Sequence, residues 1–226
     1  MTLLLFDIDG TLLRVTGGVD RAVAHAITTV TGRSVSTDGV SFSGRTDPEI
    51  FRDVLRASGV ADPEPVLDDV IATYAEAARQ TIGPADVKLL PGIPALLSAL
   101  SDRPDVFLGL LTGNVEAIAY HKLRGAGLPD VFSVGAFGSD DADRAALPPI
   151  AVRRASSRAD QSFSLPDTVI IGDTHHDIHC ARAAGSRSVA VCTGHYGRAD
   201  LAPHAPDLLL DDLRDPRAFI AEILGS

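Results

Sequence analysis

The sequence predicts an α/β fold: a Rossmann-like, doubly wound parallel sheet that carries an inserted all-helical domain. Two observations predict it. From residue 93 onward, short apolar runs alternate with helical patterns, which favours parallel strands joined by helical crossovers. Between residues 15 and 83, three helical patterns follow one another with no strand pattern between them. Hydrophobic residues make up 45% of the 226, enough for a substantial core.

The first predicted elements along the chain are one strand and three helices. The run Thr2–Phe6 is short, apolar and without alternation, as is typical of a strand buried on both faces. Helices are expected over Val19–Val30, from Asp47 onward and over Glu64–Gln80. Asp47 is expected to be the N-cap of its helix, with Pro48 at the first helical position. The expected domains are residues 1–14 plus 84–226 as the α/β core and residues 15–83 as the helical insertion.

The remainder of the chain alternates between strand and helix patterns. Strands are expected over residues 106–111, 132–136, 168–171 and 188–192, with a last short strand or turn within 207–213. Helices are expected over residues 93–100, 115–125, 149–159, 177–184 and 216–224. Ligands bind at the carboxyl ends of the strands in open parallel sheets, so a site is expected at that edge.

Composition excludes some partners. The formal net charge of -10 and the isoelectric point near 5.0 argue against non-specific binding to nucleic acid or to an anionic membrane. No apolar run is long enough to span a bilayer and no basic segment precedes the first one, so we expect a cytoplasmic protein, as a monomer or homodimer. Cys180 and Cys192 lack metal-site spacing and are expected to be free thiols.

Three predicted strands end in polar residues. The tails are "FDIDGT" (residues 6–11), "LLTGN" (110–114) and "IIGDTHHD" (170–177). Parallel strands bring these tails to one edge, which would hold Asp7, Asp9, Thr112, Asn114, Asp173 and Asp177. Carboxylates gathered in this way repel one another unless a cation is present, and oxygen ligands favour Mg²⁺. The Thr112 hydroxyl and the Gly113–Asn114 backbone suit a phosphate group.

The three motifs, in this order and with a helical block after the first, resemble the haloacid dehalogenase superfamily of phosphohydrolases. The likeness is closest to the phosphoglycolate-phosphatase-like branch with a small helical cap. It implies a Mg²⁺-dependent phosphatase of small phosphorylated metabolites that works through an aspartyl-phosphate. Asp7 would be the nucleophile, and Asp9 the general acid and then the general base.

The resemblance also implies roles for the other motif residues. The metal ligands would be Asp7, the main-chain carbonyl of Asp9, and Asp173, with Asp177 binding through water or positioning the others. Thr112, Gly113 and Asn114 would hold the phosphoryl oxygens. A sugar phosphomutase of the same fold and a catalytically impaired phosphate-binding domain remain alternatives.

One residue of the family pattern is missing. A lysine is expected before the helix after the third strand, but "GSDDADRAALPPIAVRRA" (residues 138–155) contains none. Arg144 occupies about that place and is predicted to supply the charge, although its planar fork differs from an ammonium group. Lys122, on the helix after "LLTGN", is the second candidate.

Two further stretches allow two interpretations each. The resemblance places "FSGRTDP" (residues 42–48) where the cap faces the active site, so Arg45 would meet an anionic leaving group, or the stretch is only a turn before a helix. His175, His176 and His179 have spacing that a zinc site can use, but solvent-facing histidines are favoured.

Overall fold

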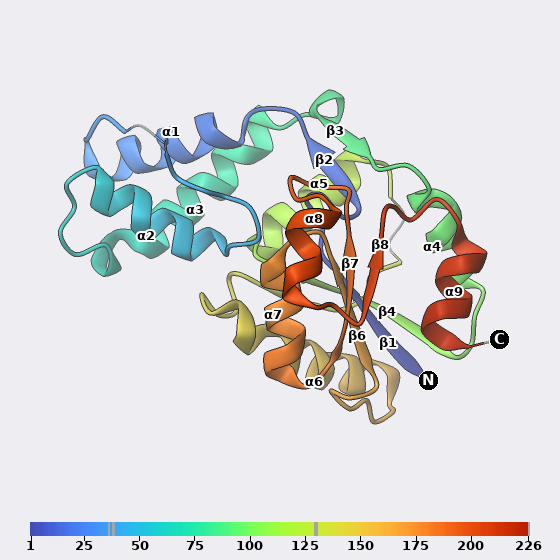
Figure 1. The fold of residues 1–226 in the computed structure, drawn as a ribbon. Coiled ribbons are helices and arrows are strands. Elements are labelled where there is room, and N and C mark those ends of the chain that lie inside the picture. Colours follow the sequence, from blue (N-terminus) through green and yellow to red (C-terminus); the bar gives the residue numbers. More distant parts are fainter. Residues whose placement is uncertain (36, 38, 129–130, 226) are drawn as a thin grey trace.

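The computed structural model describes residues 1–35, 37, 39–128 and 131–225. Its core is a six-stranded sheet with the order β5-β4-β1-β6-β7-β8 (Figure 1). The strands are β1 (Thr2–Phe6), β4 (Val106–Thr112), β5 (Gly135–Phe137), β6 (Thr168–Gly172), β7 (Arg187–Val191) and β8 (Leu208–Leu210). Each neighbouring pair is parallel, so the predicted fold class is confirmed.

Strand β1 lies at the point where the strand order reverses. It pairs with β4 on one side, with Leu5 opposite Gly109, and with β6 on the other, with Leu5 opposite Ile170. The chain fills β4 and β5 first and then crosses to β6, β7 and β8. The three strands with polar tails are therefore neighbours, at the switch point where such sheets bind ligands.

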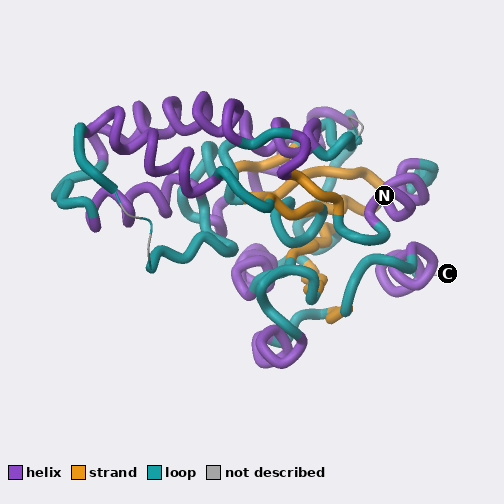
Figure 2. Tube along the Cα trace, turned by 90° about the horizontal axis from the view of Figure 1, so that it is seen from above, coloured by secondary structure: helices purple, strands orange, loops and turns teal. Residues whose placement is uncertain are grey.

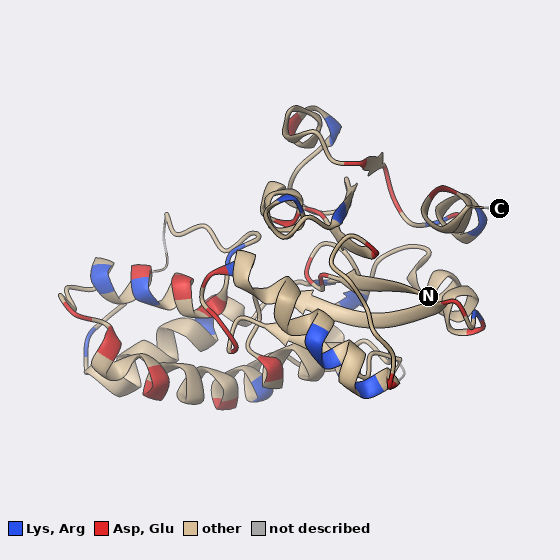
Figure 3. Ribbon diagram, turned by 90° about the horizontal axis from the view of Figure 1, so that it is seen from below, with Lys and Arg blue, Asp and Glu red and all other residues tan. Residues whose placement is uncertain are grey.

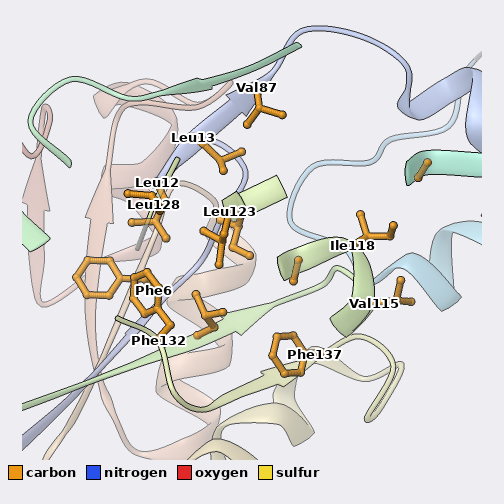
Figure 4. Packing of buried hydrophobic residues seen from close by; sticks show 14 of the residues in the cluster. Phe6, Leu12, Leu13, Val87, Val115, Ile118, Leu123, Leu128, Phe132 and Phe137 are labelled. Carbon is orange, nitrogen blue, oxygen red and sulfur yellow. The ribbon is translucent and has the colours of Figure 1, made fainter. Parts of the chain in front are cut away.

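Helices cover both faces of the sheet. They are α4 (Ile93–Ser101), α5 (Glu116–Gly125), α6 (Leu147–Ala159), α7 (His175–Ala184), α8 (Arg198–Leu201) and α9 (Pro216–Leu224), with 3-10 turns η1 (Pro84–Asp86), η2 (Arg144–Ala146) and η3 (Ala202–His204). Side chains of β1 alternate between two hydrophobic clusters: Leu3 and Leu5 join the one with α6, and Leu4 and Phe6 join the other. Phe6 packs edge-to-face on Phe132 with ring centroids 6.0 Å apart (Figure 4).

Three helices form the insertion: α1 (Val19–Thr31), α2 (Asp47–Ala57) and α3 (Glu64–Thr81). They extend to one side of the sheet (Figure 2), and acidic and basic residues are interspersed along them (Figure 3). A short antiparallel ribbon joins the insertion to the core, with β2 (Leu13–Val15) before it and β3 (Val87–Leu89) after it. The sequence did not predict this ribbon, because three-residue strands are too short to show a period.

Several predicted boundaries are wrong in detail. The strand expected over residues 132–136 is Gly135–Phe137, because the ladder with β4 begins at Gly135 and residues 132–134 lie outside it. Asp47 is not an N-cap: Thr46 precedes α2, and the Asp47 carboxylate bonds elsewhere. Cys180 is buried, Cys192 is half-buried, and both are free thiols. None of the helices in the described part of the chain is long and apolar enough to cross a membrane.

Candidate active site

Three carboxylates meet where β1 and β6 end. Asp7 follows β1, Asp173 follows β6, and Asp177 lies in the first turn of α7. One oxygen from each lies within 4.8 Å of the other two, and all three side chains are buried. Gly10 turns the chain behind Asp7 with φ at +85°, and a Cβ at that position would overlap the Asp173 carboxylate. We call Asp7, Asp173 and Asp177 the acid cluster.

Burial sets the electrostatics of the acid cluster. Burial, together with the charges of Asp177 and Asp9, raises the pKa of Asp7 to about 6, against the lowering effect of Arg144. Burial also raises the pKa of Asp173 well above its ordinary value. A divalent cation would relieve this cost, and a donor set made only of carboxylate oxygens fits Mg²⁺.

Arg144 lies against the acid cluster. Its Nη2 is 3.3 Å from Asp7 Oδ1 and 2.5 Å from Asp177 Oδ1. Although burial lowers the pKa of Arg144, the charges of Asp177 and Asp7 raise it overall, so the guanidinium stays charged. Its Nε is buried and has no hydrogen-bond partner among the described residues. Arg144 therefore supplies positive charge beside Asp7 and retains an unused donor for an anion.

Asp177 has a second task at the start of α7. Its Oδ2 accepts hydrogen bonds from the Thr174 backbone N–H at 3.0 Å and from the Thr174 hydroxyl at 2.7 Å. This is a capping box, in which the side chains of Thr174 and Asp177 satisfy free N–H groups of the first turn. Helix capping and the contact with Arg144 are therefore compatible in one residue, since Asp177 uses Oδ2 for the cap and Oδ1 for Arg144.

The Asp9 carboxylate lies outside the acid cluster and has different partners. Its Oδ2 accepts from Lys122 Nζ at 2.6 Å and from Asn114 Nδ2 at 2.7 Å. Lys122 also donates to Asn114 Oδ1 at 2.6 Å and is only 3% exposed. Both candidate cations thus reach the site, but they contact different acids: Arg144 contacts Asp7 and Lys122 contacts Asp9.

The tail of β4 forms the third side of the site. Thr112 is fully buried, and its Oγ1 accepts from Asn114 Nδ2 at 2.9 Å and from the Asn114 backbone N–H at 3.4 Å. Thr112 does not cap α5, whose N-cap position is Val115. A Cβ on Gly113 would overlap the carbonyl oxygen of Arg45, so glycine here lets the inserted helices approach the core.

The segment before α2 is bonded to the core beside this tail. The Asp47 backbone N–H donates to Gly113 O at 2.8 Å, and Asp47 Oδ2 accepts from the Val115 N–H at 2.8 Å. Thr46 Oγ1 donates to Ala142 O at 2.7 Å. Burial raises the pKa of Asp47 to about 6, with Lys122 opposing the shift. A carboxylate of the insertion therefore caps a core helix within electrostatic range of Lys122.

Two more residues of the insertion bear on the site. Arg45 Nη2 lies 2.7 Å from Asp53 Oδ2 and 2.9 Å from Glu49 Oε1, so acids of α2 hold its guanidinium. Phosphate binding by Arg45 stays a prediction. Tyr74 on α3 is buried, and burial followed by the charges of Asp47 and Asp9 raises its pKa well above the ordinary value. Its ring packs edge-to-face on the Phe51 ring, with centroids 4.9 Å apart.

Sequence reasoning missed Asp47 and Tyr74 as site residues. The sequence around Asp47 predicts only a helix cap, and Tyr74 has the pattern of a core residue on an amphipathic helix. A surface cavity of about 460 Å³ lies elsewhere, and none of the predicted site residues lines it.

Comparison with known proteins gives consistent matches. A family model described as haloacid dehalogenase-like hydrolase matches residues 4–191. The pyrophosphatase PpaX of Anoxybacillus flavithermus is 27% identical over 98% of this chain and 96% of its own. The plasmid phosphoglycolate phosphatase of Cupriavidus necator is 28% identical over 94% of this chain and 90% of its own. The tyrosine-protein kinase PtkA of Mycobacterium tuberculosis is 31% identical over 88% of this chain, which spans 64% of that kinase.

A solved structure matches over nearly the whole chain as well. CbbY from Rhodobacter sphaeroides, in complex with phosphate, is 25% identical with a TM-score of 0.73, over 95% of this chain and 96% of its own. The match therefore includes the helical insertion as well as the sheet.

Proposed function

The chain belongs to the haloacid dehalogenase-like hydrolase family, and from this premise we propose that it is a Mg²⁺-dependent phosphatase of small phosphorylated metabolites. The observation that carries the proposal is the separation of Asp7 from Asp9. Asp7 lies in the acid cluster beside Arg144, whereas the Asp9 carboxylate is bonded to Lys122 and Asn114. Two carboxylates in different surroundings can divide nucleophilic and proton-transfer work between them.

In the first step, an oxygen of ionised Asp7 forms a bond to phosphorus as the bond to the leaving oxygen breaks. Asp9 gives its proton to that leaving oxygen. In the second step, Asp9 takes a proton from water as the water oxygen bonds to phosphorus and the bond to Asp7 breaks. Asp7, Asp173, Asp177 and the Asp9 main-chain carbonyl would hold Mg²⁺ directly or through water, and the ion would offset the charge of the phosphoryl group.

The two buried cations support different parts of this reaction. Arg144, with its unpartnered Nε, takes the place of the family's lysine next to the nucleophile and offers a donor to a phosphoryl oxygen. Lys122 holds the Asp9 carboxylate and the Asn114 amide in fixed positions. Thr112 and Gly113 with Asn114 form the remaining phosphate contacts.

The helical insertion, residues 15–83, acts in this proposal as a cap that closes over the leaving group. Its bonds from Asp47 to the backbone of Gly113 and Val115 hold it against the β4 tail, which would exclude water during the first step. Arg45 on the same segment would meet an anionic leaving group after release from Asp53. The names of the relatives differ in substrate, and transfer of a phosphoryl group is what they share.

The test is a panel of phosphate compounds with Mg²⁺ and with EDTA. The panel includes phosphoglycolate, pyrophosphate, sugar phosphates and nucleotides. We expect phosphate release from at least one member with Mg²⁺, none with EDTA, and recovery when Mg²⁺ is restored. Equal release in EDTA would refute the metal requirement, and no release from any member would favour the impaired phosphate-binding domain or the sugar phosphomutase, which releases no net phosphate.

A further inference from the structure

Four of the seven histidines lie together beside α7. His175, His176 and His179 are on α7, and His204 ends η3. The His204 ring stacks on His175 with centroids 5.0 Å apart and meets His179 edge-on at 4.9 Å. His179 is exposed, whereas Asp177 on the same helix is buried in the acid cluster. The four imidazoles lie together around this helix, and we call them the histidine cluster.

Two ring nitrogens of the histidine cluster converge. His179 Nε2 and His204 Nδ1 are hydrogen-bonded at 3.0 Å, and a metal ion would replace the proton that they share. Two nitrogen ligands of a tetrahedral zinc ion, each bonded at about 2.0–2.1 Å, lie roughly 3.3 Å apart. The observed spacing is therefore close to that of a pair of adjacent metal ligands.

His175 is placed to be the third ligand. It precedes His179 by one helical turn, so both side chains leave the same face of α7. The ring centroid of His175 lies 5.8 Å from that of His179. It lies 5.2 Å from the ring centroid of Tyr196, which it meets edge-on. The nitrogens of the three rings do not all lie within 4.8 Å of one another in the structure, so binding to one ion requires the His175 ring to rotate away from its stacking contact with His204.

The backbone that carries His204 is held against α7. Arg182 Nη2 donates to the carbonyl oxygens of His204 at 2.5 Å and of Ala205 at 3.1 Å. His176 has a different neighbour. Its ring lies against Gly44 of the insertion, so closely that a Cβ at Gly44 would overlap it. Three histidines of the cluster therefore contact one another on a fixed scaffold, and the fourth contacts the inserted helical domain.

We propose that His175, His179 and His204 form a binding site for a borderline transition-metal ion such as Zn²⁺, Ni²⁺ or Cu²⁺. Imidazole nitrogen suits these ions, whereas Mg²⁺ takes oxygen ligands, so the histidine cluster and the acid cluster select different metals. Water completes the coordination, since His179 is exposed. The site is independent of the proposed phosphatase reaction and stands or falls separately from it.

The test is calorimetric titration of Zn²⁺ into the full chain with Mg²⁺ in large excess, which keeps the acid cluster filled. The wild type should bind one equivalent. His179→Gln and His204→Gln should each weaken binding by about tenfold or more, which corresponds to ~1.4 kcal/mol or more. His25→Gln is the matched control, since it removes an exposed histidine of α1, and it should bind as the wild type does.

Two further measurements identify the ligands. Electron paramagnetic resonance of the Cu²⁺-loaded wild type should show couplings to imidazole nitrogen, which His204→Gln should reduce. Unchanged Zn²⁺ affinity in both cluster variants would overturn the proposal. Loss of the Zn²⁺ equivalent in Asp173→Asn, with both histidine variants unaffected, would also overturn it by assigning the ion to the acid cluster. The two histidines lie on different elements, so misfolding of one variant, seen by circular dichroism, leaves the other informative.

Discussion

Arg144 Nη2 lies 3.3 Å from Asp7 Oδ1, and both side chains are buried. The same guanidinium contacts Asp177, so one cation offsets two carboxylates of the acid cluster. A buried charge that loses its partner is strongly destabilising, which makes this contact a test of how the acid cluster is held together before any metal binds.

Arg144→Met should lower the free energy of unfolding by about 3–5 kcal/mol in EDTA, because Asp7 and Asp177 are left uncompensated. Mg²⁺ should restore more stability to this variant than it adds to the wild type. Urea denaturation with and without Mg²⁺ measures both effects. Arg154→Met is the control, since its partner Asp140 is nearer the surface, and its loss should be much smaller. Equal losses in the two variants would contradict the assignment.

Lys122→Met should slow hydrolysis of alkyl phosphates more than that of p-nitrophenyl phosphate. Lys122 fixes Asp9, and an alkoxide leaving group needs the proton that Asp9 supplies, whereas nitrophenolate leaves without it. We expect kcat/KM to fall by up to about 10²-fold on the alkyl substrate. Lys88→Met changes the one other lysine, which is exposed on β3, and should alter neither rate. An equal loss on both substrates would mean that Lys122 does not act through Asp9.

Asp47→Asn should change how stability depends on pH. The pKa of Asp47 is raised from 3.8 to about 6 in the folded protein, so the folded state binds more protons than the unfolded state between these values. The contribution of Asp47 to stability therefore falls as pH rises through this window. The stability of the Asn variant relative to wild type should grow from pH 4 to pH 7, by up to ~3 kcal/mol. A difference that is constant with pH would show that the carboxylate is not desolvated.

Mg²⁺ affinity should fall as pH is lowered through about 6. Metal binding needs ionised carboxylates, and burial has raised the pKa of Asp7 to about 6 and that of Asp173 well above its ordinary value. Each displaced proton should cost up to about tenfold in apparent affinity per pH unit below the pKa. Titration calorimetry at several pH values measures this Mg²⁺ affinity. The Asp173→Asn variant should lose the site. Constant affinity from pH 5 to 8 would place the ion elsewhere.

The sheet and its polar edge could be predicted because their signals are local. Apolar runs mark the strands, and parallel pairing then brings the tails of β1, β4 and β6 together without further information. Arg144 could be placed from its position before α6 alone. The β2–β3 ribbon could not be predicted, because each of its strands has three residues, too few to show the alternation of a strand.

Contacts of the insertion with the core depend on tertiary packing. The bond from Val115 to Asp47 joins positions 68 residues apart, and the bond from Lys122 to Asp9 spans 113. Each partner alone has an ordinary local interpretation, Asp47 as a helix cap and Lys122 as a residue of a packing helix. The histidine cluster likewise needs His204, which joins α7 only through the fold.

The central claim is that Asp7 is the nucleophile of a Mg²⁺-dependent phosphatase. The most direct measurement is the rate of phosphate release by Asp7→Asn, with saturating Mg²⁺ and the substrate that the wild type hydrolyses fastest. The account predicts no release above background, with the folded structure retained by circular dichroism. Turnover at the wild-type rate would show that phosphorus is attacked by another group and would contradict the account.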